Sequence, residues 1–456
     1  MSKYNYKVKY TDSSWLSKEG YGRVAHLPFI VDGRPGYHRA GSRYLIDRGL
    51  GIWVAGSQGV SVRPPTARSI HSYAAWLCNF LEWADKRSID LVTADYVDHI
   101  YGRYQKELIT GIWGRDNQGL SETTVNLYVD TAVDFLNWMA AKGERPPLEV
   151  PIVTRSSGRS SATRSVSHRL KPFEIRQGRI RQLPRTLQMP QDAELDRWLE
   201  SVYQNEGETF GLMCETVIET AIRREEVCCW RLNTLPINPK DWVITNPSAL
   251  LKDQLVRVTL SLGAKGKEYG FDHGDKIGPR REIQMPLRLA NKIHAYRNKT
   301  RPLLLAKAIS KVRGAEAQRT TRDNAVHLFL TPEGQRETSS RFYKAWKSGA
   351  LPFASWSPHL GRHWWACSTL LQEIKNTEMF NAANFVVPGL LIASVLTDVI
   401  RLKITPQLGH ISSNTSAIYL NWAADQMGVA LPERYQYAML DEEAVMDNDW
   451  AEDDNS

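Results

Sequence analysis

Hydrophobic residues recur at three- and four-residue steps between residues 66 and 143, a spacing typical of amphipathic helices. The first predicted helix has Thr66 as its N-cap, because a threonine hydroxyl can accept a hydrogen bond from the first helical turn. A second helix begins near Thr93, and a third begins near Ser121 and ends at Gly143. We therefore expect a small helical domain at residues 61–150.

From residue 189 to about residue 437 the pattern is mixed, and it predicts a larger domain. Helical spacing covers residues 192–202 and 209–227, and residues 256–262 then alternate as a strand does. Residues 281–286 are the expected partner strand, followed by a strand at 327–330 and a helix around 341–346. The predicted fold class is mainly α with a small β-sheet: a helical domain followed by an α+β domain.

Three segments lie outside these two domains. Residues 1–60 are rich in glycine and aromatic residues and are expected to be an N-terminal extension without chemistry. Residues 151–188 hold many basic residues and one acid, Glu174, and are expected to be a basic flexible linker. We expect this linker to be flexible when free and ordered along a DNA backbone, although a solvated linker without a ligand fits the composition too. The candidate DNA-binding residues are Arg155, Arg159, Arg164, Arg169, Lys171, Arg176, Arg179, Arg181 and Arg185.

Charge supports a polyanionic partner. The chain of 456 residues has a net charge of +8, and residues 438–456 form an acidic tail. Because residues 441–456 hold eight acids and no Lys or Arg, the charge on residues 1–440 is +16. Lysines and arginines in such excess neutralise phosphates, so double-stranded DNA is the expected partner.

Cysteines and apolar segments limit the setting in which the chain works. The five cysteines are odd in number and include no C-x-x-C pair, so neither a disulfide framework nor a zinc site is expected. The N-terminus lacks the apolar region of a signal peptide, and residues 385–400 are too short and interrupted to span a bilayer. We expect a cytoplasmic, nucleoid-associated protein without a membrane partner.

Candidate chemistry begins with two basic segments of the larger domain. Arg223 and Glu226, in the segment AIRREEV, are three residues apart and share a helix face, so the carboxylate can orient the guanidinium toward a phosphate. A surface ion pair is the alternative. Lys265 lies in the segment GAKGK at the expected tip of a β-hairpin, from which an ammonium can deliver a proton in a DNA groove. A solvated turn lysine is the alternative there.

Two further segments follow toward the C-terminus. His359 and Arg362, in SPHLGRH, share a helix face and can contact one phosphate together. His410 follows a glycine that permits a tight turn, and Tyr419 comes nine positions later on a predicted helix. Taken singly, a chance H-x-x-R match and a tyrosine packed in the core explain these residues as well.

The order and spacing of these segments resemble the tyrosine recombinase, or phage integrase, family. The segments AIRREEV, SPHLGRHWWA and LGHISSNTSAIY are similar to its two arginine boxes and its final His-to-Tyr box. The resemblance covers most of residues 61–437 and implies a SAM-like core-binding domain at 61–150 and a catalytic domain at 189–437. It implies a DNA recombinase that is active as a homotetramer on paired sites, with accessory proteins as further partners.

The resemblance also implies a role for each residue. Arg223 and Arg362 clamp the scissile phosphate, His359 and His410 bind it and assist proton transfer, and Glu226 supports Arg223. Lys265 is the general acid and Tyr419 is the nucleophile that forms a 3′-phosphotyrosyl link. No cofactor, metal or ATP is implied, because the covalent link conserves the energy of the broken bond.

The sequence departs from the family pattern in three places. Ala221 stands where the family usually has glycine, and the interval from Arg362 to His410 is long, which indicates an insertion within residues 373–403. Lys267 and Lys276 compete with Lys265 for the role of general acid. A type IB topoisomerase and a DNA-binding regulator without catalysis on the same fold remain the alternatives.

Overall fold

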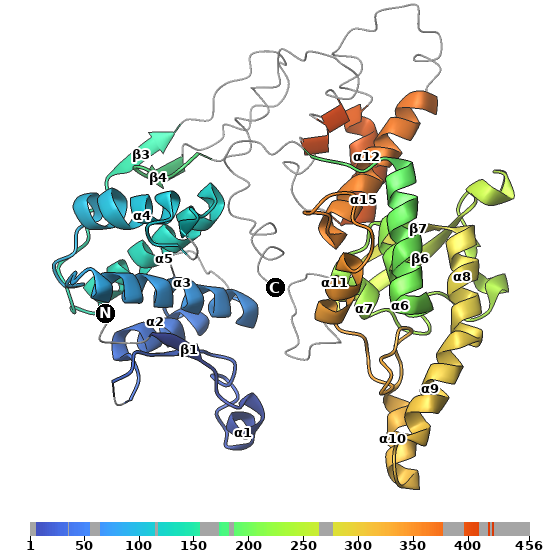
Figure 1. Cartoon of the computed structure of the whole chain (residues 1–456), viewed down its shortest axis with the longest axis horizontal. Helices are drawn as coiled ribbons and strands as arrows, with labels where there is room; N and C mark the ends of the chain where they lie inside the picture. Colours follow the sequence, from blue (N-terminus) through green and yellow to red (C-terminus); the bar gives the residue numbers. More distant parts are fainter. Residues whose placement is uncertain are drawn as a thin grey trace, which may run out of the picture. The chain divides into compact units, whose positions relative to one another are not determined.

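The computed structural model describes residues 6–34, 36–54, 64–114, 117–155, 173–181, 187–263, 277–376, 396–409, 418–419 and 422–423. The chain divides into two compact units, residues 1–184 and residues 185–456 (Figure 1).

The first unit is built around two long helices, α3 (Ala67–Lys86) and α5 (Glu122–Ala141), which pack against each other. Both begin where the sequence predicts. The Thr66 side chain accepts a hydrogen bond from the Ser69 amide at 3.1 Å, and the Ser121 side chain accepts one from the Thr124 amide at 3.4 Å. The predicted second helix is a π-helix, η1 (Tyr96–Gln105), which continues into α4 (Lys106–Thr110).

The first sixty residues belong to this unit, which corrects the expected boundary at residue 60. They form β1 (Lys7–Lys9), α1 (Ser13–Lys18), β2 (Phe29–Val31) and α2 (Arg39–Gly49), with β1 and β2 antiparallel. Ile30, Tyr44 and Leu45 are buried in the same hydrophobic cluster as Phe80 of α3 and Phe135 of α5. Apolar side chains of this segment therefore complete the core of the helical domain instead of forming an extension.

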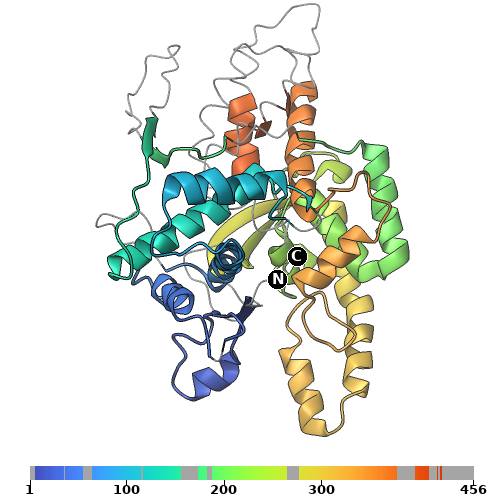
Figure 2. The same ribbon diagram turned by 60° about the vertical axis from the view of Figure 1, so that its left-hand side comes forward.

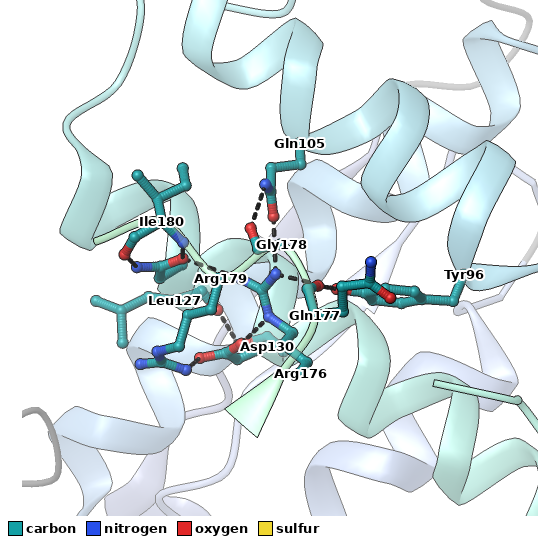
Figure 3. Close-up of polar contacts among 11 residues, drawn as sticks. Tyr96, Gln105, Leu127, Asp130, Arg176, Gln177, Gly178, Arg179 and Ile180 are labelled. Carbon is teal, nitrogen blue, oxygen red and sulfur yellow. Dashed lines mark hydrogen bonds and ion pairs between the residues drawn. The ribbon is translucent and has the colours of Figure 1, made fainter. Parts of the chain in front are cut away.

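A hairpin replaces part of the expected flexible linker. Strands β3 (Ile152–Arg155) and β4 (Phe173–Arg176) pair antiparallel within the first unit. Arg176 is buried and donates hydrogen bonds to Asp130 (2.6 Å) and Gln105 (2.8 Å), as Figure 3 shows, and to Asn126 at 3.0 Å. A fourth bond joins it to the Tyr96 hydroxyl at 3.2 Å.

These contacts engage the donors of Arg176 inside the protein, and the DNA-binding role expected for Arg176 stays a prediction. Arg179 is more exposed and pairs with the same Asp130 at 2.6 Å (Figure 3). Arg181 is exposed, and the Arg155 side chain lies outside the described part of the chain. The other expected linker contacts also lie outside the described residues: Arg159, Arg164, Arg169, Lys171 and Arg185.

The second unit surrounds a three-stranded antiparallel sheet in the order β5 (Val243–Ile244), β6 (Leu255–Leu262) and β7 (Ile277–Pro286). The predicted hairpin is confirmed, with Val258 opposite Ile283. The long helix α6 (Asp192–Thr220) contacts β7, α8 (Leu287–Asn298), α11 (Ser339–Lys347) and α12 (Pro358–Asn376). Trp198, Trp346 and Trp356 are fully buried in the core between them.

The helices expected at 192–202 and 209–227 are separated by a kink of α6 at Gly207, whose φ is 80°, and the second of them ends at Thr220. The prediction of a strand at 327–330 is wrong. The two ends of this segment make only isolated β-bridges, His327 with Arg231 and Leu330 with Arg336. Two helices that follow α8, α9 (Thr300–Ser310) and α10 (Ala315–Asn324), extend away from the sheet in Figures 1 and 2.

A second hydrophobic cluster of this unit positions the candidate site. It joins α12 to a π-helix, η5 (Ile400–Ile404), and to the short α15 (Thr405–Leu408), through Leu370, Ile404 and Leu408. Tyr419 and Trp422 are buried in the same cluster. Within the part of the chain that the structure describes, no helix is long and apolar enough to cross a bilayer.

Candidate phosphodiester site

Glu226 is the buried centre of a cluster of arginines. It lies on α7 (Arg224–Cys228), and its carboxylate accepts hydrogen bonds from both terminal nitrogens of Arg281, one of them at 2.8 Å. It also accepts the backbone N–H of Arg223 at 2.6 Å and lies 3.4 Å from the Arg223 Nη1. The sequence reasoning placed Arg223 on a helix, whereas it is the residue that caps α7.

The backbone breaks between α6 and α7 for a local reason. Ala221 has a φ of 53° and ends α6, a left-handed conformation that glycine adopts more easily than alanine. The chain turns there and starts α7 at once, so that Arg223 and Glu226 face the ends of other elements. This is the position at which the sequence has alanine where glycine was expected.

The charge of Glu226 is held by these neighbours. Burial of the carboxyl favours its neutral form, but the hydrogen bonds and charge of Arg281, with the charges of Arg223 and Arg362, lower its pKa from 4.5 to about 2. Three guanidinium groups therefore surround one carboxylate. The excess positive charge suits an anion, and arginines bind carboxylate and phosphate groups through their planar set of donors.

Arg362 ties three segments of the site together. It lies on α12, is buried, and donates to the carbonyl oxygens of Ala221 and, at 3.0 Å, Leu408. Burial, followed by the charge of Arg223, lowers its pKa from 12.5 to about 9, so it stays protonated at neutral pH. The ends of α6 and α15 are thus held at one guanidinium.

The chain leaves α15 toward His410 within this cluster. Arg223 Nη2 donates to the Gly409 carbonyl at 3.3 Å. Gly409 has a φ of 64°, and a Cβ there would come within 2.7 Å of the Arg281 side chain. Gln407 accepts the Gln284 amide at 2.8 Å and donates to the Thr220 carbonyl at 2.9 Å, which fixes α15 to β7 and α6.

Tyr419 and the histidines of α12 form a second group. The Tyr419 hydroxyl lies 2.9 Å from His363 Nδ1, and His363 Nε2 lies 3.0 Å from His359 Nε2. Burial raises the pKa of Tyr419 well above its ordinary value of 10.0, although the charge of Arg362 acts in the opposite direction. The phenol is therefore neutral in this arrangement, and 1% of the residue is exposed.

The structure thus brings together five of the residues singled out from the sequence: Arg223, Glu226, His359, Arg362 and Tyr419. Lys265 and His410 lie outside the described residues, although both flanks of their segments are described. Gly263, at the end of β6, has a φ of 72°, and a Cβ there would lie 2.7 Å from the Glu225 carbonyl oxygen. Gly263 therefore lies directly against α7.

Sequence reasoning missed three residues of the site: Arg281, His363 and Gln407. His363 had a readable signal, because it is four residues after His359 and shares its helix face. Arg281 and Gln407 had none, since nothing in the sequence separates them from other arginines and glutamines. Among the described residues, no three His, Cys, Asp or Glu side chains gather in a way that could hold a metal ion.

Comparisons with known proteins give structural matches at low similarity. Neither a family model nor a curated protein matches the sequence. The chain matches the XerH site-specific recombinase bound to difH substrate in a pre-cleavage complex, at 16% identity and a TM-score of 0.44, over 86% of this chain and 94% of that chain. It also matches XerH in a post-cleavage complex with a palindromic difH substrate (16%, 0.42, 84% and 85%). The match to the XerA recombinase has 16% identity and a TM-score of 0.28, over 89% of this chain and 98% of that chain.

Proposed function

We propose that this chain is a site-specific DNA recombinase that cleaves and rejoins strands through a 3′-phosphotyrosyl link to Tyr419. One observation carries the proposal: a buried tyrosine hydroxyl, two histidines and an arginine cluster with excess positive charge gather on one unit. A phosphodiester bound by the arginines would lie beside the one group of this set that can act as a nucleophile.

Each described residue has a defined task in this proposal. Arg223 and Arg362 hold the two non-bridging oxygens and stabilise the charge that develops on the phosphorane. Glu226 keeps the guanidinium planes of Arg223 and Arg281 in place. His359 donates a hydrogen bond to the phosphate. His410 and Lys265 complete the set on the strength of their position in the sequence, Lys265 as the acid that protonates the departing 5′-oxygen.

The burial of Tyr419 gives the resting state a clear property. With 1% of the residue exposed and the pKa of its phenol raised, Tyr419 is shielded from solvent and protonated before DNA binds. Docking of DNA adds a phosphate whose neighbours are arginines, and the phenolate forms only as it attacks. Neither ATP nor a metal takes part in this proposal, because the link to Tyr419 conserves the energy of the phosphodiester.

The decisive experiment traps this link. The wild-type protein, incubated in EDTA with a nicked suicide duplex made from the DNA that flanks its gene, should give an SDS-resistant adduct at the 3′ side of the break. The Tyr419→Phe variant should bind that duplex with unchanged affinity, since one hydroxyl adds little to a phosphate-dominated interface, yet form no adduct.

Peptide mapping and a relaxation assay decide between the proposal and its rivals. An adduct on Tyr435 or Tyr437 would show that one of these residues, and not Tyr419, is the nucleophile. Relaxation of supercoiled plasmid by single molecules, without exchange between sites, would make the chain a type IB topoisomerase. The absence of an adduct with any DNA would make it a regulator.

A further inference from the structure

Three side chains of the candidate site form a continuous hydrogen-bonded row. Tyr419 contacts His363 Nδ1 at 2.9 Å, and His363 Nε2 contacts His359 Nε2 at 3.0 Å. The two imidazole rings are perpendicular, with their centres 4.6 Å apart. Both nitrogens of His363 are thus engaged, one with the proposed nucleophile and the other with a proposed phosphate ligand.

Helix α12 creates this row. His359 and His363 are four residues apart and so lie on one face of the helix. Between them, Gly361 lets the helix approach Trp346, because a Cβ there would lie 2.7 Å from the indole. His363 is 1% exposed, whereas His359 is only half-buried. The row of side chains therefore runs from the protein interior toward the surface.

The contacts allow two arrangements of the hydrogens. In the first, the Tyr419 hydroxyl donates to His363 Nδ1, His363 Nε2–H donates to His359 Nε2, and His359 keeps Nδ1–H as a donor for a phosphate. In the second, every donor is reversed, so that His359 Nε2–H donates to His363 and His363 Nδ1–H donates to the phenol. The first arrangement alone can take a proton from Tyr419.

On the basis of the proposed function, we propose that His363 removes the phenolic proton of Tyr419 during attack and relays a proton to His359. The Tyr419 O–H bond breaks as His363 Nδ1–H forms, and His363 Nε2–H breaks as His359 Nε2–H forms. The phenolate oxygen bonds to phosphorus, and the 5′-oxygen leaves with the electron pair of its bond and takes a proton from Lys265. His359 ends as an imidazolium beside the phosphate, and religation reverses each transfer.

The charges that face His363 explain why a relay suits it better than a simple base does. Burial, and then His359 and Arg362, lower the pKa of His363 well below 6.5, so that a charged His363 is disfavoured. Arg362 and Cys367 are the groups that act on Tyr419. In a relay His363 gains one proton as it loses another, so the positive charge appears on half-buried His359, next to the anion.

Two conservative variants separate the relay from a structural role. His363→Gln keeps a donor toward His359, and His363→Asn keeps an acceptor toward Tyr419, but neither can pass a proton. With the suicide duplex described above, both should form adduct about a hundredfold more slowly or worse near pH 7, as is typical for lost acid–base catalysis. Their rates should rise about tenfold per pH unit as hydroxide ionises the phenol, while the wild-type rate changes little. Gln372→Ala, at an exposed position of α12, should behave as wild type.

A duplex with sulfur at the 5′ leaving atom tests which side of the reaction is impaired. It needs little protonation of the leaving group, so it should not rescue the His363 variants. Rescue by sulfur, an equal loss of rate at every pH, or no loss at all would each overturn the relay. If the wild-type protein forms no adduct, the proposed function itself fails.

Nitrogen NMR of the free protein tests the row without catalysis. Neutral His363 should carry its hydrogen on Nε2, and its Nδ1 signal should move in Tyr419→Phe, where the donor is lost. A hydrogen on Nδ1 would mean that the row runs the other way. The relay would then be wrong even if the wild-type protein forms the adduct, so the two failures can be told apart.

Discussion

Glu226 keeps a negative charge at a position where 1% of the residue is exposed, and three arginines make this possible. Its pKa is lowered from 4.5 to about 2, so the charged form stabilises the folded state. This shift of the Glu226 pKa corresponds to about 3 kcal/mol of folding free energy, at about 1.4 kcal/mol per pH unit. For a carboxylate with a lowered pKa, this stabilisation is complete above about pH 4.5 and is lost as the pH falls toward 2.

Glu226→Gln should therefore reduce the free energy of unfolding by about 3 kcal/mol near neutral pH, because Arg281 and Arg223 lose their buried counter-charge. Urea unfolding between about pH 2 and pH 7 measures this, and the difference from wild type should shrink below about pH 4.5. The control is Glu282→Gln on β7, whose exposed pair with Arg257 at 3.5 Å should contribute less than about 1 kcal/mol. Equal losses in the two variants would contradict this account.

Single residues of the site differ in how far the sequence could predict them. The sequence predicts Arg223, Glu226, His359, Arg362 and Tyr419 as site residues because their order and spacing resemble those of the tyrosine recombinase family. Arg281 could not be predicted as a site residue, since Arg280 beside it has the same side chain. The strand turns Arg280 to the outside and Arg281 toward Glu226, a choice made by the packing of β7.

At the scale of elements, the short helix α15 controls where the chain enters the site. Gly409 ends it with a φ of 64° and lies against Arg281, which also donates to the Gln407 carbonyl at 3.3 Å. A side chain at Gly409 would displace Arg281 from Glu226 and shift the segment that leads to His410. The proposed catalytic set therefore depends on a residue that has no chemistry of its own.

Gly409→Ala should slow adduct formation by about tenfold or more, since a shift of this kind misaligns catalytic groups, and should cost about 1–2 kcal/mol of stability. Gly143→Ala is the control, because Gly143 has a similar φ of 73° but a Cβ added there would meet no other atom within 4 Å. It should lose about 1 kcal/mol for its backbone conformation and leave the rate of adduct formation unchanged. Similar rates for Gly409→Ala and wild type would remove α15 from the mechanism.

The predicted elements were most accurate where local signals agree with packing. The caps Thr66 and Ser121 mark α3 and α5, and alternation marks the β6–β7 hairpin. The prediction of a flexible basic linker after residue 150 was wrong in part. The composition of this segment does not reveal that Arg176 meets acceptors on η1 and α5. Long-range contacts of this kind override a local reading of charge.

Arg176→Ala should consequently lower the stability of the first unit by about 3 kcal/mol, because it removes the buried hydrogen bonds to Asp130, Gln105 and Asn126. Arg179→Ala should lower it by about 1 kcal/mol or less, since that pair with Asp130 is more exposed. Thermal unfolding of the full chain measures both changes. If Arg176→Ala unfolds as wild type does, but binds DNA with a salt dependence reduced by about one charge, the result would support the DNA-binding role.

At the scale of the whole molecule, the first unit extends from the N-terminal segment to the hairpin β3–β4. Its stability depends on contacts that residues 1–60 make with the helical domain. Asp134 of α5 accepts the Tyr44 hydroxyl at 2.6 Å and the Trp53 indole N–H at 2.9 Å, and burial raises the pKa of Asp134. The Trp138 indole N–H donates to Asp47 at 3.0 Å. Without residues 1–60, Asp134 would lose both of its hydrogen bonds to this segment, and the face of α3 and α5 that Ile30 and Leu45 cover would meet water.

A fragment of residues 1–184 should therefore unfold cooperatively, whereas a fragment of residues 61–184 should be poorly folded at room temperature. Loss of several buried side chains, at about 1.5–3 kcal/mol each, exceeds the stability of a typical small domain. Circular dichroism on heating, with Tyr44→Phe in the longer fragment as a control that removes one hydrogen bond, measures the difference. Tyr44→Phe should lose about 1–2 kcal/mol and stay folded. If a fragment of residues 61–184 is as stable as residues 1–184, the domain boundary lies at residue 60. The N-terminal segment then contributes nothing to the stability of the helical domain.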